Sequence, residues 1–321
     1  MKLFRQITSI LLVIFCFIGF DLAIWNLATK RCINYTSEGM QAKSVELDKY
    51  LPFDPDSRIA RVDSSLKLEG DLPVLDGAAA LYPIFSAVVG ATYLEESVSF
   101  DGENFTADSS LHYTNTRGAY KAIVDGDADL IFCVKPSDEQ LAYAAEKGVE
   151  LEFVTIGYEA FVFIVNKDNP VDSLTTDQLR GMFAGEYTNW KEVGGDNYII
   201  DVLQRNPGSG SQTALEAFMD GREVKKHLLG FLGRSIGFSF RFYVSDIVEN
   251  GGVKMLSLDG VYPSKENVAN GTYPIVSDLY VVYRKDDDNP NLRALIDWIL
   301  SPEGQKIVEE SGYIPINLKR G

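Results

Sequence analysis

The 321-residue chain has few of the residues that build metal centres, disulfide frameworks and histidine-based catalytic sites. It contains three cysteines and two histidines, and no two cysteines form a C-x-x-C pair. Zinc sites and activated nucleophiles need clusters of these residues, so we expect no metal, no cofactor and no enzymatic activity. Cys32 and Cys133 either pair in an exported chain or, as we expect, remain unpaired thiols, with Cys133 buried.

The chain also lacks an excess of positive charge. Its 30 Lys and Arg residues face 46 Asp and Glu residues, which gives a net charge of −16 and a pI near 4.6. The electrostatic field of a protein with this net charge does not attract nucleic acid or an anionic membrane, so we expect neither as a partner. An anionic ligand would have to be held by local donors. The length and the 45% hydrophobic content fit about two globular domains.

The N-terminus has the form of an export signal. A basic start, residues 1–5, precedes an apolar run at 7–20, and Asp21 then interrupts it. We interpret residues 1–32 as a signal peptide or an N-terminal membrane anchor, and both remain open because no convincing cleavage site follows. The mature chain is then expected outside the cytoplasm and in contact with a membrane only through this segment. The polar stretch 33–70 is predicted to be a linker and loosely ordered lead-in.

From residue 72 onwards, strand and helix patterns alternate. The apolar runs predict strands at 72–75, 129–134, 151–165, 198–203 and 273–283. Helical spacing or capping signals predict helices at 78–89, 117–124, 140–147, 211–219, 291–300 and 302–310, and a further helix that follows a cap at 173–175 and ends at 182. This order predicts an α/β fold with mainly parallel sheets flanked by helices.

Two β runs, 151–165 and 273–283, are unusually long and bracket the central third of the chain. They are typical of two strands that cross between lobes and act as a hinge. We therefore predict lobe I at residues 71–156 plus 275–321 and lobe II at residues 157–274.

The sharpest local feature is the loop at 204–213, Gln-Arg-Asn-Pro-Gly-Ser-Gly-Ser-Gln-Thr, which joins a strand to a helix. Gly208 and Gly210 allow a tight turn, Ser209 and Ser211 offer hydroxyls, and Arg205 offers a planar guanidinium. The helix that follows points free N–H groups at the same place. The loop predicts a cradle for a tetrahedral anion, or else an ordinary glycine-rich turn with a serine cap. It matches neither a P-loop nor a nucleophile elbow.

Two further loops follow strands and precede helices, at 76–79 and 114–116. Ligands of open α/β sheets bind beyond the carboxyl ends of the strands, so these loops and the loop at 204–213 can face one cleft. The amides of Ala78 and Ala79 and the hydroxyl of Thr116 are the expected donors. Thr116 has the alternative role of a helix N-cap.

The combination of these segments resembles the phosphate-binding proteins of phosphate ABC transporters. The similar segments are 75–83, 119–120, 126–132, 136–140, 156–171, 185–195 and 204–212, and the resemblance covers roughly residues 72–317. It implies a two-lobed type II periplasmic-binding-protein fold that closes on inorganic phosphate and delivers it to an ABC permease. We expect such a protein to be a monomer.

The resemblance carries ligand-binding roles to Ala78, Ala79, Thr116, Arg205, Ser209, Gly210 and Ser211, with Lys135 and Tyr158 as further candidates. Two departures stand out. The family usually has Ser or Thr in the first loop, where this chain has alanines. It also places an Asp after the strand at 129–134 to accept the proton of phosphate, and this chain has Val134-Lys135-Pro136 there. Two alternatives therefore remain: a binding protein for another oxyanion such as sulfate or molybdate, and a membrane-anchored sensor with the same fold.

Overall fold

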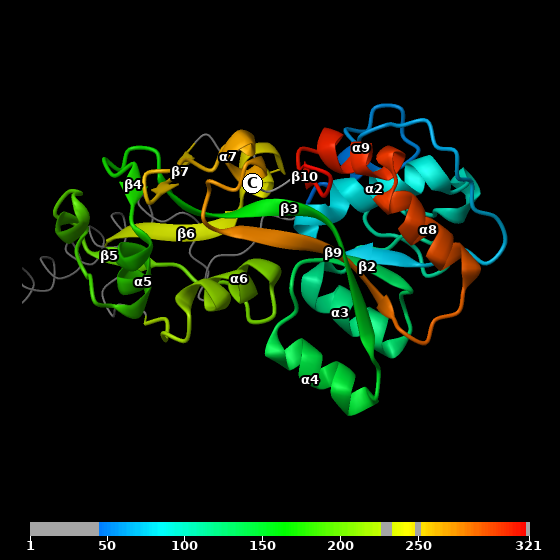
Figure 1. Ribbon diagram of the computed structural model, residues 1–321, viewed down its shortest axis with the longest axis horizontal. Helices are drawn as coiled ribbons and strands as arrows, with labels where there is room; N and C mark the ends of the chain where they lie inside the picture. The colour runs from blue at the N-terminus through cyan, green and yellow to red at the C-terminus, as the bar shows by residue number, and fades with distance from the viewer. Residues whose placement is uncertain (1–44, 226–232, 248–251, 319–321) are drawn as a thin grey trace, which may run out of the picture.

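The computed structural model describes residues 45–225, 233–247 and 252–318, and it shows two groups of elements joined by a long strand (Figure 1). We call the group around β1 and β2 lobe I and the group around β5 and β6 lobe II. The expected leader, residues 1–32, and the start of the expected linker, residues 33–44, lie outside the described residues. Within the described ranges, none of the helices combines the length and the apolar character needed to cross a membrane.

One mixed sheet runs through both lobes in the strand order β1-β2-β9-β3-β6-β5. Both β7 and β10 pair with β3, and β4 pairs with β8 in a separate small sheet. The strands are β1 Leu75–Gly77, β2 Leu130–Cys133, β3 Leu151–Asn166, β4 Ser173–Leu174, β5 Ile200–Val202, β6 Arg234–Phe240, β7 Val253–Met255, β8 Ser257–Leu258, β9 Val276–Arg284 and β10 Ile314–Pro315.

The strand β3 connects the lobes. It pairs with β9 from Leu151 to Ala160 and with β6 from Phe161 to Val165. Its first half therefore belongs to lobe I and its second half to lobe II, while β9 lies antiparallel beside it near the junction (Figure 1). The two crossing strands predicted from the long apolar runs are thus confirmed.

The prediction of mainly parallel sheets is wrong. The pairs β1–β2, β5–β6 and β4–β8 are parallel, but β2–β9 and every pairing of β3 are antiparallel. The chain leaves lobe I along β3 and returns along β9, so strands that meet at the junction run in opposite directions. A buried apolar run has the same appearance in either direction, which is why the sequence pattern did not reveal this.

Helices flank the sheet, and their starts follow local capping chemistry. At the start of α4, the Ser137 hydroxyl accepts the N–H of Gln140 and the Gln140 side chain accepts the N–H of Ser137. Thr175 and Gln178 form the same capping box at α5. The helices are α2 Tyr82–Thr92, α3 Asn115–Asp125, α4 Asp138–Lys147, α5 Thr176–Ala184, α6 Gly210–Met219, α7 Lys265–Ala269, α8 Pro290–Leu300 and α9 Pro302–Glu310.

The described part of the expected linker, residues 45–70, is packed onto lobe I. Val45, Tyr50, Ile59 and Leu68 are buried in the same hydrophobic cluster as α2. The Ser86 hydroxyl of α2 also donates to the carbonyl of Tyr50. A loosely ordered lead-in is therefore wrong for these residues. Their apolar side chains are too widely spaced to show a helix or strand period, but each one covers part of the lobe I core.

Candidate functional site

A cavity of about 320 Å³ lies between the lobes, beyond the ends of β1, β2 and β5. At roughly 30 Å³ for each water, it would hold about ten water molecules, which is ample for a tetrahedral anion. All seven residues predicted as ligand-binding line this cavity. The lining consists of Ala78, Ala79, Ala80, Leu81, Asn115, Thr116, Arg117, Val134, Glu159, Arg205, Asn206, Pro207, Ser209, Gly210, Ser211, Ser239, Phe240, Tyr243, Leu279 and Tyr313.

Residues 204–211, which we call the Gly-Ser loop, carry the densest set of donors. Gly208 has a φ of 73°, a left-handed conformation that favours glycine. Ser209 is the N-cap of α6, and its hydroxyl oxygen accepts the N–H of Gln212 at 3.4 Å. The Gln212 side chain in turn accepts the N–H of Arg205 at 2.9 Å. The loop is thus held from within, and the start of α6 faces the cavity with its free N–H groups.

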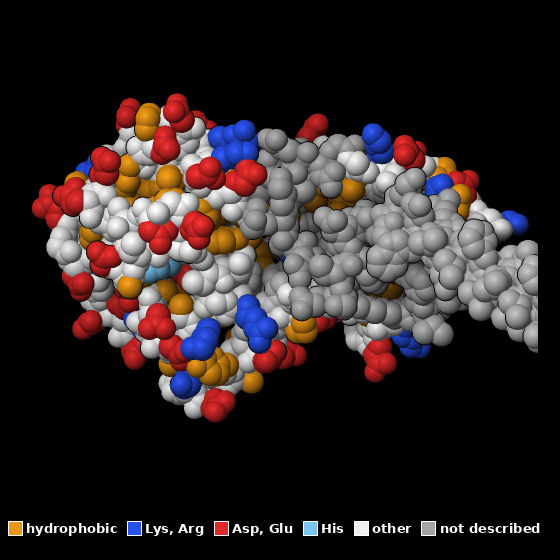
Figure 2. Space-filling view, turned by 180° about the vertical axis from the view of Figure 1, so that it is seen from behind, with side chains coloured by type: hydrophobic (Ala, Val, Ile, Leu, Met, Phe, Trp, Pro, Cys, Tyr) orange, Lys and Arg blue, Asp and Glu red, His pale blue; other side chains and the backbone are white. Residues whose placement is uncertain are grey.

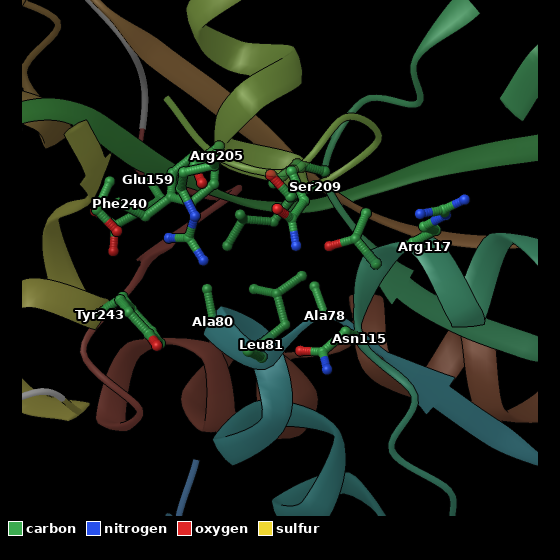
Figure 3. Close-up of a pocket in the computed structure, with 18 of the residues that line it drawn as sticks. Ala78, Ala80, Leu81, Asn115, Arg117, Glu159, Arg205, Ser209, Phe240 and Tyr243 are labelled. Atoms are coloured by element: carbon green, nitrogen blue, oxygen red, sulfur yellow. The ribbon is translucent and has the colours of Figure 1, made fainter. Parts of the chain in front are cut away.

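The guanidinium of Arg205 projects into the cavity from the start of this loop (Figure 3). Burial lowers its pKa, and the nearby Tyr243 and Tyr113 raise it. No described acidic side chain is among the groups that act on it electrostatically. An arginine stays charged in a protein. This cation has no acidic partner among the described residues, so an anionic ligand would supply the missing negative charge.

Lobe I places the start of α3 opposite the Gly-Ser loop. Asp76, at the end of β1, accepts both the N–H and the hydroxyl of Thr114, which is the N-cap residue of α3. Burial raises the pKa of the Asp76 carboxyl, and its hydrogen bonds with Thr114 oppose that shift. Thr116 lies inside the helix, so its alternative role as an N-cap is wrong. Its largely buried side chain faces the cavity instead.

The first loop, residues 78–81, offers fewer hydrogen-bond donors to the cavity than the sequence predicted. The Ala78 N–H donates to the Phe132 carbonyl oxygen at 2.8 Å, so the amide that we expected to meet an anion is already occupied. Ala79 and Ala80 are the first two residues of a short 3-10 helix, Ala79–Leu81. Neither of their N–H groups has a hydrogen-bond partner within the described residues. The loop therefore presents two amides and no hydroxyl to the cavity.

The two lobes touch at Gly210. A Cβ atom added to this glycine would lie 2.6 Å from Cγ2 of Val134 and 3.4 Å from Oγ1 of Thr116. Gly210 is thus a glycine because lobe I approaches it closely, whereas the sequence pattern explained this glycine by a tight turn. The contact brings the start of α6 and the start of α3 to the same end of the cavity.

Glu159 of β3 is the one acidic side chain among the described lining residues. Its carboxylate accepts from the Ala160 N–H at 2.8 Å, the Arg241 Nε at 3.2 Å and the Phe242 N–H at 3.1 Å. Arg241 also donates to the Gly312 carbonyl at 2.6 Å. Burial raises the pKa of Glu159, and Arg241 opposes this shift. The carboxylate is therefore committed to the junction of the lobes rather than offered to a ligand.

The exterior of the molecule differs from this interior. Figure 2 shows acidic side chains scattered over lobe I, with several Lys and Arg side chains gathered at its lower edge, where α3 and α4 lie. Lys121 of α3 and Lys147 of α4 both form ion pairs with Asp125. Arg117 lines the mouth of the cavity, and its guanidinium points away from the centre (Figure 3).

Two predicted candidates are not brought to the cavity. Lys135 is exposed and Tyr158 is half-buried beside β10, and neither belongs to the lining. Sequence reasoning missed Asn115, Ser239 and Tyr243, which do line it. Ser239 lies on β6, whose alternating apolar residues were a strand signal that we did not use.

The comparisons with known proteins agree with this architecture. The sequence matches the PBP superfamily domain model over residues 74–303. It is 28% identical over 264 residues to the phosphate-binding protein PstS of Bacillus subtilis, which covers 78% of this chain and 82% of that protein. A PstS of Borreliella burgdorferi is 28% identical over 179 residues, covering 50% of this chain and 64% of that protein.

Among solved structures, the fold matches a substrate-binding protein assigned to phosphate ABC transport from Clostridium perfringens, solved with bound phosphate. The identity is 24%, the TM-score is 0.60, and the match covers 77% of this chain and all of that one. At this identity the likeness establishes the fold, which is the two-lobed type II arrangement predicted from the sequence.

Proposed function

This chain belongs to the PBP superfamily, and we propose that it captures inorganic phosphate between its lobes and delivers it to the permease of an ABC transporter. The observation that carries the proposal is Arg205, a desolvated cation that faces a cavity without a described acidic partner. The relatives named as phosphate-binding proteins support the choice of phosphate.

Each lobe would contribute donors to the anion. Lobe II would supply the Arg205 guanidinium, the hydroxyls of Ser209 and Ser211, and the N–H groups at the start of α6. Lobe I would supply the Thr116 hydroxyl and the two amides of the first loop. Because the ligand would bridge both lobes, it would bind the closed arrangement more tightly than an open one and so shift the protein towards closure.

Such a protein acts by binding and release, and we propose no chemical step for it. Among the described residues, no hydrogen bond joins a serine hydroxyl of the cavity lining to a histidine or a carboxylate, so the lining offers no nucleophile paired with a base. We place the protein outside the cytoplasm, where the N-terminal segment would direct or anchor it, and we expect it to work as a monomer with a permease as its partner.

One observation favours a second candidate, a binding protein for another oxyanion. Phosphate carries a proton near neutral pH and sulfate does not, so an acceptor carboxylate in the site discriminates between them. The only acidic side chain of the described lining is Glu159, and it is held by Arg241 and two amides. Selectivity against sulfate is therefore expected to be weaker than a free carboxylate would give.

The test is isothermal titration of the protein, freed of bound ligand by unfolding and refolding, with phosphate and then with sulfate as competitor. We expect micromolar or tighter phosphate binding that an equal concentration of sulfate does not abolish. Tight sulfate binding with no phosphate binding would replace the proposal by the second candidate. A folded sample that binds neither anion would contradict the phosphate proposal and would exclude sulfate as the ligand of the second candidate.

A further inference from the structure

The side chain of Gln140 has a second hydrogen bond that its capping role does not require. Its Oε1 accepts the N–H of Ser137 at 2.8 Å, which completes the capping box of α4. Its Nε2 donates to the carbonyl oxygen of Gly208 at 3.1 Å. Since α4 belongs to lobe I and Gly208 belongs to the Gly-Ser loop of lobe II, one amide group fixes the start of a helix and joins the lobes.

The partner of this bond belongs to the Gly-Ser loop, between the lining residues Pro207 and Ser209. Gly208 precedes Ser209, the N-cap of α6, and its φ of 73° makes the local backbone a tight turn. The nearest atoms to a Cβ placed on Gly208 would be Nε2 of Gln140 at 3.7 Å and Cγ of Arg117 at 4.0 Å. Lobe I therefore contacts this turn through the side chains of Gln140 and Arg117. The contact from Gln140 is a hydrogen bond.

The bond exists only while the lobes are together. Opening the cleft would separate α4 from the Gly-Ser loop and break it, whereas the capping box within lobe I would remain. An interaction made in one of two conformations shifts the population towards that conformation. It stabilises the closed arrangement without touching the ligand.

We propose that Gln140 is a positioning residue that holds the lobes closed over the bound anion and so slows its release. This inference rests on the proposed function, because the anion is the ligand whose release is measured. The inference predicts which rate constant changes. The loss of the Nε2 donor should raise the dissociation rate constant of phosphate and leave the association rate constant nearly unchanged.

Two substitutions separate this role from capping and from charge. Gln140→Glu keeps an oxygen for the capping box and removes the donor, and Gln140→Met removes the donor without adding charge. Gln178 provides the matched control, because its Oε1 accepts the Thr175 N–H at 2.9 Å in the same kind of capping box and it lies outside the cavity lining. Gln178→Met reports what the loss of the box alone does, and Gln178→Glu reports what the added charge alone does.

The measurement is stopped-flow association and release of phosphate, with thermal unfolding of the phosphate-free proteins recorded in parallel. We expect both Gln140 variants to release phosphate about three- to tenfold faster than the wild type, as the net worth of one hydrogen bond implies, with association within about twofold. The Gln178 variants should release it at the wild-type rate, although the Met variants of both sites should lose similar thermal stability.

Release rates of the Gln140 variants equal to those of the Gln178 variants would overturn the inference, provided that the wild type binds phosphate. If the wild type does not bind phosphate, the proposed function fails instead, so the two failures can be told apart. A faster release confined to Gln140→Glu would also count against the inference, because repulsion between the new carboxylate and the anion would then explain it.

Discussion

The Gly-Ser loop of lobe II and the first loop of lobe I face the same cavity with different chemistry. The Gly-Ser loop presents a guanidinium, two hydroxyls and the start of α6, while residues 78–81 present the free amides of Ala79 and Ala80 among alanine and leucine side chains. On the proposed function, lobe II would hold the charge of the anion and lobe I would mainly close over it. We call this division of roles the asymmetry of the lobes.

Arg205→Gln should have the largest effect. It removes the half-buried cation that is aimed into the cavity. The loss of a hydrogen bond between charged groups, at about 2.7 kcal/mol, corresponds to roughly a hundredfold weaker phosphate binding. Isothermal titration measures this directly. Arg222→Gln is the control, since Arg222 is an exposed residue of lobe II that pairs with Glu186 at 3.7 Å outside the lining, and it should change the affinity by less than about twofold.

Gly210→Ala tests whether the lobes must touch. The added methyl group would lie 2.6 Å from Cγ2 of Val134, so the lobes would have to separate. Overpacking of this kind costs about 2 kcal/mol, which is roughly a thirtyfold loss of phosphate affinity. The double variant Gly210→Ala with Val134→Ala removes the opposing methyl groups and should recover most of the affinity. A double variant as weak as Gly210→Ala alone would show that the contact is not what matters.

Thr116→Val measures the side-chain contribution of lobe I. It keeps the shape of the side chain and removes the hydroxyl, so phosphate binding should weaken about tenfold, which corresponds to about 1.4 kcal/mol. The unfolding midpoint of the phosphate-free variant should stay within a few degrees of the wild type. If this loss equals or exceeds that of Arg205→Gln, then the two lobes share the anion evenly and the asymmetry is wrong.

Ala79→Ser should have the smallest effect and the opposite sign. A hydroxyl placed beside the free amides of the first loop would add a donor that this loop lacks. We expect phosphate binding to become about threefold tighter, within the net worth of one hydrogen bond. Ala142→Ser on the exposed face of α4 is the matched control and should not change the affinity. Weaker binding by Ala79→Ser would mean that the anion lies against the alanine side chain.

The sequence predicted the parts of the site that depend on local pattern. Strand-loop-helix units located Thr116, Arg205 and Ser211, because a polar loop between a buried strand and a helix must lie at the carboxyl edge of the sheet. A capping signal likewise predicted the helix at 140–147, which begins at Asp138 as α4.

The remaining features depend on contacts between distant residues. The hydrogen bond from the Ala78 amide to Phe132 joins neighbouring strands of one lobe, and the bond from Gln140 to Gly208 joins the two lobes. The antiparallel direction of β3 and β9 follows from the path of the chain between them. None of these leaves a periodic or compositional signal, so they had to be observed.

The most direct test of the asymmetry is a crystal structure of the protein grown with phosphate. We expect the anion within roughly 3 Å of the Arg205 guanidinium and of N–H groups at the start of α6, with Thr116 and the Ala79 or Ala80 amide as its contacts to lobe I. The Ala78 N–H should still donate to Phe132. An anion bound away from Arg205, or one held chiefly by lobe I, would contradict the assignment of the charge-bearing role to lobe II.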